Sequence, residues 1–101
     1  MVRNQESVSE LVYWKGEEMT AFERLLSTGY HLDVFQWNDG RERGIGVCFQ
    51  NSEIKDGMFL VGEYGRGQTF EEACEDYIHK ISSKTLVLHA YTDHRKEVVF
   101  I

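Results

Sequence analysis

The chain has 101 residues, with 42% hydrophobic residues, 28% charged residues and a formal net charge of −6. This length predicts a single domain, residues 1–101, with one modest core. The many aromatic residues argue against disorder, and the acidic charge argues against general binding to nucleic-acid phosphates.

The sequence shows neither a membrane span nor a targeting signal. No apolar run reaches the ~20 residues that cross a bilayer, and residues 1–6 lack the apolar segment of a signal peptide. We therefore expect a cytoplasmic protein without a membrane partner. The two cysteines, Cys48 and Cys74, both lie in apolar segments, so we interpret them as reduced, buried thiols.

Residues 1–16 form an N-terminal segment with two alternative interpretations. Ser7 and Glu10 have the spacing of a helix capping box and precede a short apolar run. The segment is therefore either one helical turn or an extended arm that docks Tyr13 and Trp14 on the domain. We assign it no function.

Residues 17–28 are predicted to form the first helix. Glu17 and Glu18 would lie in its first turn, where carboxylates are favoured, and Gly29 fits the position after its end. Four apolar side chains share one face of this helix: Met19, Phe22, Leu25 and Leu26.

Three strands are predicted next, because the hydrophobic period changes from 3.6 to 2. They cover residues 30–37, 45–49 and 58–64. Asn38-Asp39-Gly40 is a strong turn signal between the first two, and the polar residues 51–57 are predicted to connect the last two. Strands that follow one another in this way predict an antiparallel meander.

The clearest pattern lies at residues 69–81, which predict an amphipathic helix. Thr69 and Glu72 have the spacing of a capping box. The apolar side chains recur with a period of 3.6 residues: Phe70, Ala73, Cys74, Tyr77, Ile78 and Ile81. The opposite face carries four carboxylates: Glu71, Glu72, Glu75 and Asp76.

Two further strands are predicted at residues 85–91 and 96–101, and residues 65–67 are predicted to be a glycine-rich turn. The element order is helix–three-stranded antiparallel meander–helix–two strands. Such grouping predicts an α+β fold built as a two-layer sandwich.

The common catalytic motifs are absent from the sequence. Cys74 would be a weak nucleophile, because neighbouring carboxylates raise the pKa of a thiol. Two groups offer candidate metal ligands: His89, Asp93 and His94 near the last turn, and Glu75 with His79 one helical turn apart. Neither group supplies four ligands at a recognisable spacing, so we expect no enzyme, no metal and no cofactor.

The segment Gly65-Arg66-Gly67-Gln68-Thr69-Phe70-Glu71-Glu72-Ala73 resembles the Gly-x-Thr-x-Glu-Glu-Ala step of HicB-like antitoxin domains. In those domains a three-stranded meander leads into a helix and then a strand. The resemblance implies a regulatory module that neutralises a small basic toxin. In size and acidity the chain also resembles phage-encoded inhibitors of host defence, including anti-CRISPR proteins.

These observations predict a small acidic inhibitor that occupies the basic surface of a nuclease or another nucleic-acid-handling enzyme. We expect no direct contact with nucleic acid, and either a monomer or a homodimer. The alternative is a HicB-like antitoxin or regulatory module that binds a small basic toxin. The residues predicted to contact the partner are Glu71, Glu72, Glu75, Asp76, Glu17 and Glu18.

Overall fold

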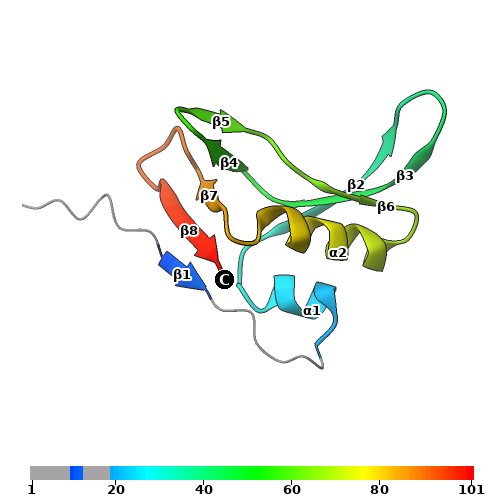
Figure 1. Cartoon of the computed structure of the whole chain (residues 1–101), viewed down its shortest axis with the longest axis horizontal. Coiled ribbons are helices and arrows are strands. Elements are labelled where there is room, and N and C mark those ends of the chain that lie inside the picture. Colours follow the sequence, from blue (N-terminus) through cyan, green and yellow to red (C-terminus); the bar gives the residue numbers. More distant parts are fainter. Residues whose placement is uncertain (1–9, 13–18) are drawn as a thin grey trace, which may run out of the picture.

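The chain folds as a mixed α+β structure in which two sheets lie beside two helices (Figure 1). The computed structural model describes residues 10–12 and 19–101. This confirms the predicted α+β class. The elements are β1 (Glu10–Val12), α1 (Ala21–Leu26), β2 (Leu32–Asn38), β3 (Arg43–Phe49), β4 (Ser52–Asp56), β5 (Phe59–Val61), β6 (Gly65–Gly67), α2 (Phe70–Ile81), β7 (Thr85–Leu88) and β8 (Lys96–Phe100).

The strands are divided between two sheets, and this differs from the predicted meander. One sheet has the order β2-β3-β6 and is antiparallel. The other has the order β1-β8-β7-β4-β5, in which only the β1–β8 pair is parallel. A strand does lie within the predicted residues 58–64, but it is shorter, and its predicted place in the meander is wrong: β5 belongs to the second sheet, and β6 supplies the third strand of the first.

Two strands lie where the sequence predicts connections. β4 falls within residues 51–57, and its only buried residue is Ile54. A strand with one buried residue shows no clear alternation, so it reads as a polar loop. β6 falls within the predicted glycine-rich turn and has just one side chain, that of Arg66.

The glycines of β6 let α2 lie directly on the strand. A Cβ atom on Gly65 would come within 2.6 Å of the Cβ of Tyr77, and one on Gly67 within 2.6 Å of the Ala73 backbone nitrogen. Both contacts are closer than packed atoms tolerate. The absence of side chains at these two positions is thus what allows the helix to pack against β6.

The structure confirms the prediction for α2: its bounds, its capping box and its buried face are as the sequence predicts. Thr69 accepts a hydrogen bond from the Glu72 backbone N–H (3.1 Å), and the Glu72 carboxylate accepts one from the Thr69 N–H (3.3 Å). Four of the six predicted apolar residues are fully buried and the other two are half-buried.

The helix α1 is shorter than predicted. It begins at Ala21 because Thr20 and Glu23 form a capping box there, and it ends at Leu26. Leu25 is fully buried, whereas Leu26, predicted on the same face, is 51% exposed. Glu17 and Glu18 lie outside the described residues.

The N-terminal segment is extended where it is described, since β1 pairs with β8. The predicted docking of Tyr13 and Trp14 lies outside the described residues. In the described part of the chain, neither helix is long and apolar enough to cross a membrane.

The core lies where the two sheets meet, and Tyr77 is at its centre. The Tyr77 hydroxyl accepts a hydrogen bond from the Phe49 backbone N–H (3.0 Å) and lies 3.4 Å from the Ser52 hydroxyl. The Phe49 ring contacts Tyr77 edge-on and stacks on Phe100, with centroids 5.5 and 6.1 Å apart. Other fully or almost fully buried side chains around them are Leu25, Val47, Ile54, Ala73, Cys74, Ile81, Leu86, Leu88 and Val98.

We predict that Tyr77→Phe destabilises the protein by about 1–3 kcal/mol, because the buried Phe49 N–H loses its acceptor. Urea denaturation of both proteins measures this difference. The matched control is Tyr91→Phe, because Tyr91 is 83% exposed; its effect should stay within about 0.5 kcal/mol. Equal stability of the Tyr77→Phe variant and the wild type would contradict the prediction.

We predict that Gly65→Ala destabilises the protein by about 1–3 kcal/mol or more, because the new methyl group overlaps the backbone of α2. Gly62→Ala is the control, since a Cβ atom there meets nothing within 4 Å. That change should be neutral or stabilise by up to about 1 kcal/mol. Thermal unfolding of the two variants measures this difference in stability. Equal melting temperatures would contradict the prediction.

Candidate functional site

The four carboxylates of α2 do not form one freely exposed face. Glu72 and Glu75 are exposed, whereas Glu71 and Asp76 are half-buried. Three of the four accept hydrogen bonds from backbone N–H groups of the chain itself. The fold therefore uses part of the acidic face that the sequence predicts for a partner.

Glu71 and Glu72 both stabilise helix beginnings. The Glu71 carboxylate accepts a hydrogen bond from the Ala21 N–H (3.0 Å), the first residue of α1. The Glu72 carboxylate accepts one from the Gln68 N–H (2.9 Å), in addition to its contact with Thr69. Glu71 thus connects the two helices, and its charge lies where the α1 backbone is partially positive.

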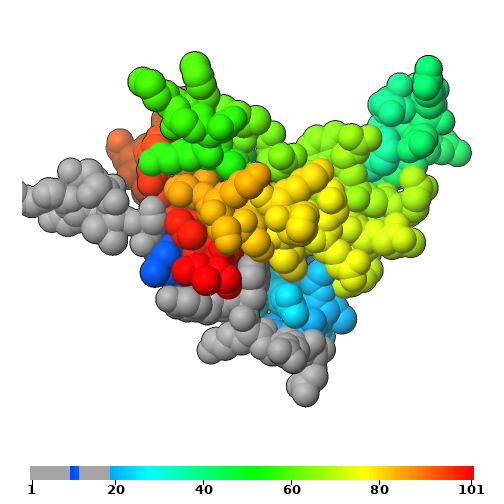
Figure 2. Space-filling view, viewed as in Figure 1, coloured from blue at the N-terminus to red at the C-terminus, as the bar shows by residue number. Residues whose placement is uncertain are grey.

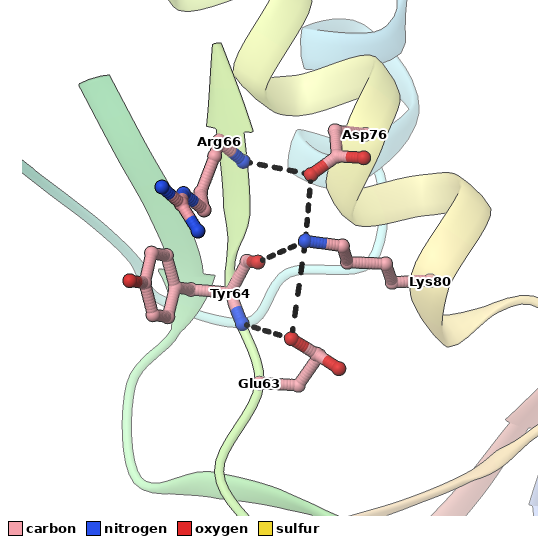
Figure 3. Close-up of polar contacts among 5 residues, drawn as sticks. All are labelled: Glu63, Tyr64, Arg66, Asp76 and Lys80. Carbon is pink, nitrogen blue, oxygen red and sulfur yellow. Dashed lines mark hydrogen bonds and ion pairs between the residues drawn. The ribbon is translucent and has the colours of Figure 1, made fainter. Parts of the chain in front are cut away.

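Asp76 belongs to a polar network that joins α2 to β6 (Figure 3). Its carboxylate accepts a hydrogen bond from the Arg66 backbone N–H (2.8 Å) and pairs with the Lys80 ammonium (2.9 Å). Lys80 also donates to the Tyr64 carbonyl (3.1 Å) and lies 4.0 Å from the Glu63 carboxylate. Because β6 is an edge strand, Asp76 covers a backbone donor that would otherwise be open to pairing.

Glu75 is the exposed carboxylate of α2 for which the described structure shows no hydrogen bond or ion pair. It lines a groove of about 500 Å³ between α1 and α2 together with Glu71. Arg24 also lines this groove, and its buried Nε has no hydrogen-bond partner among the described residues. Two carboxylates one helical turn apart therefore face a hollow that has an unsatisfied donor in its wall.

The candidate metal ligands form no metal site in the described part of the chain. Across residues 10–12 and 19–101, no three His, Cys, Asp or Glu side chains form a group that could hold a metal ion. Glu75 and His79 line the groove between the helices. His89 ends the strand predicted at residues 85–91 early, because its φ of +54° is left-handed.

Both cysteines are free thiols. Burial, with smaller contributions from Glu71 and Glu75, raises the pKa of the Cys74 thiol to about 11. Burial, reinforced by Asp33, also raises the pKa of Cys48. Protonated thiols are poor nucleophiles at neutral pH.

A surface that the sequence analysis did not predict lies on the face of the β2-β3-β6 sheet that carries Arg66. The Arg66 guanidinium lies 4.0 Å from the centre of the Trp37 ring, and Phe35 contacts Tyr64 edge-on at 5.1 Å. The aromatic side chains of β2 lie opposite glycines of β3. The spacing Phe35-x-Trp37 before Gly44-x-Gly46 is the signal that could have revealed this surface.

Two hairpins project from the body of the molecule, as Figure 2 shows at its upper corners. The tip between β2 and β3 carries the turn at Asn38-Asp39-Gly40, where Asp39 accepts hydrogen bonds from the Arg41 and Glu42 N–H groups. The hairpin of β4 and β5 exposes apolar side chains: Met58 at 96% and Phe59 at 75%. These side chains are available for contact, and both lie within residues 58–64, where the sequence predicts the third strand of the meander.

We predict that Asp76→Asn lowers stability by about 0.5–1 kcal/mol at neutral pH, because it removes the ion pair to a partly exposed Lys80. Burial raises the pKa of Asp76, but hydrogen bonds from Lys80 and the Arg66 N–H outweigh it, so its pKa lies below the usual 3.8. A lowered folded pKa stabilises the protein above the unfolded pKa, and this stabilisation is lost as the pH falls through the folded value.

The difference between the wild type and the Asp76→Asn variant should therefore shrink below about pH 4. Urea unfolding between about pH 7 and pH 3 measures it. Asp93→Asn is the control, because Asp93 is exposed and makes no hydrogen bond or ion pair in the described structure. A difference that is constant with pH would exclude the ion pair as its source.

Comparison of the chain with protein-family models, with curated proteins and with solved structures finds no match.

Proposed function

We propose that the protein is a small inhibitor that binds a protein partner by accepting a basic side chain of that partner in the groove between α1 and α2. The partner is a nuclease or another nucleic-acid-handling enzyme, and the biological setting is phage-encoded anti-defence of the anti-CRISPR type. Inhibition consists of occupying the partner's surface. No chemical step, cofactor or direct contact with nucleic acid is involved.

The observation that carries this proposal is the placement of Glu71 and Glu75 in one groove. They are four residues apart on α2, so their side chains lie on the same side of the helix. The groove of about 500 Å³ is large enough for the side chain of an Arg or Lys. A guanidinium entering it meets two carboxylates, and charge-assisted hydrogen bonds of this type are the strong ones.

The charge of the molecule supports a basic partner. The formal net charge of −6 attracts a cationic surface and increases the association rate. Within the groove, the positive charge of Arg24 balances the negative charge of one of the two carboxylates. Glu75 makes no hydrogen bond or ion pair within the described structure that a partner would have to break, so it is the residue best placed to bind.

In the HicB-like alternative, the same groove binds a small basic toxin. The glycine step of the motif has a structural role here, because Gly65 and Gly67 lie under α2. A short basic toxin encoded next to this chain would favour the alternative, whereas neighbouring phage genes would favour the inhibitor.

The proposal is tested by expressing the protein in cells that carry a panel of guide-loaded CRISPR nucleases and measuring phage plating. We expect the wild type to restore plaques against at least one nuclease. Glu75→Lys should weaken binding to that purified nuclease by at least about tenfold, because it places a repelling charge in the groove. Inhibition of no nuclease would reject the anti-CRISPR function.

The control is Glu42→Lys, which makes the same charge change at an exposed residue between β2 and β3. It should bind as the wild type does, apart from the effect of net charge on the association rate. Equal weakening by the two variants would show that net charge, and not the groove, determines binding. Unchanged binding by Glu75→Lys would exclude the groove as the contact.

A further inference from the structure

We propose that a second pocket, lined by His31, His89, His94 and Lys96, binds a small oxyanion of the phosphate class. The pocket has a volume of about 290 Å³ and also includes Tyr30 and Gln50 in its lining. None of these residues lines the groove between α1 and α2. The site is therefore independent of the proposed inhibitor function.

The composition of this pocket is the first observation that supports the proposal. Three of the four histidines of the chain line it, although His31 is far from His89 and His94 in the sequence. Each imidazole offers an N–H donor, Lys96 offers an ammonium, and the Gln50 amide offers further donors. An acidic protein thus gathers donors and basic groups from three segments around one small hollow, which is the chemistry that recognises an oxyanion.

The backbone holds these histidines in defined positions. The His89 N–H donates to the Asn51 carbonyl (2.8 Å), and the Gln50 N–H donates to the His31 carbonyl (2.8 Å). The Thr92 hydroxyl donates to the His89 carbonyl (2.9 Å) and accepts from the His94 N–H (3.0 Å). Hydrogen bonds therefore connect three segments around the pocket: the one with His31, the one with Gln50 and Asn51, and the loop with His89 and His94.

His89 and Asn51 face one another in an unusual backbone conformation. Their φ angles are +54° and +56°, in the left-handed region that residues other than glycine rarely adopt. Such conformations persist only where the surrounding structure determines them, and they concentrate at functional sites. Here the strained residue is one of the three histidines that line the pocket.

Several other charged groups lie around the pocket. Lys96 pairs with Glu10 (2.7 Å) and lies over the Tyr30 ring (5.2 Å), and the Tyr30 hydroxyl donates to Glu10 (3.4 Å). His31 lies 3.6 Å from Asp33. Glu53 lines an adjacent hollow together with His89, and Asp93 lies in the loop next to His94.

These carboxylates lie close to the donors of the pocket, so a bound anion has to compete with them for those donors.

The test is a titration of the full chain with inorganic phosphate at about pH 6, followed by NMR of the imidazole C–H resonances. We expect saturable shifts for His31, His89 and His94 and none for His79, which lies in the other groove. Sodium chloride at the same ionic strength is the reference for screening. Equal shifts with chloride, a shift of His79 of the same size, or no shift at all would overturn the proposal.

Variants locate the site. His94→Gln and His31→Gln should each weaken phosphate binding by about tenfold or more, because each removes a charge-assisted donor. His79→Gln is the matched control and should bind as the wild type does. Both pocket histidines are exposed, so their substitution leaves the core intact. Full phosphate affinity in His94→Gln and His31→Gln, or a response of the pocket to zinc and none to phosphate, would reject the oxyanion site.

Discussion

The hydrogen bond from the Phe49 N–H to the Tyr77 hydroxyl lies at the point where the chain leaves one sheet and enters the other. β3 ends at Phe49 and β4 begins at Ser52, whose hydroxyl donates to the Phe49 carbonyl (2.6 Å). A backbone N–H buried at this junction has no strand partner, and the phenol supplies its acceptor. Burial also raises the pKa of Tyr77 to about 12, so the hydroxyl keeps its proton. Both sheets therefore depend on one side chain of α2.

The contacts that place α2 also determine which of its charges are available. Glu71 holds the beginning of α1, and Asp76 holds the backbone of β6. Such contacts tie carboxylates to the domain and leave Glu75 as the one without a hydrogen bond or ion pair in the described structure. The proposed binding site is consequently a groove between two helices, and not a whole acidic face. The pocket proposed to bind an oxyanion is lined by residues of loops that the same sheet arrangement brings together.

Local sequence patterns predict those elements whose apolar residues form one continuous buried face. α2 has six apolar residues at helical spacing and a capping box, so its bounds followed directly from the sequence. The sequence predicts β3 because the apolar residues Ile45, Val47 and Phe49 occur at every second position. The sequence does not indicate β4 and β6, because β4 buries only Ile54, and two of the three residues of β6 are glycines without side chains. The pairing of β6 with β3 depends instead on the close approach of α2.

The sequence by itself determined the α+β class, the central helix and the presence of four carboxylates on its polar side. It also showed an acidic chain with the motif residues Gly65 and Gly67 before that helix. Only the tertiary structure decided that these glycines form a strand, that Glu71 and Glu75 line a groove with α1, and that three histidines meet in one pocket. The physical reason is the separation along the chain over which each kind of interaction acts. Capping and periodicity act within a few residues of the chain, whereas sheet order and pockets result from contacts between segments that are distant in sequence.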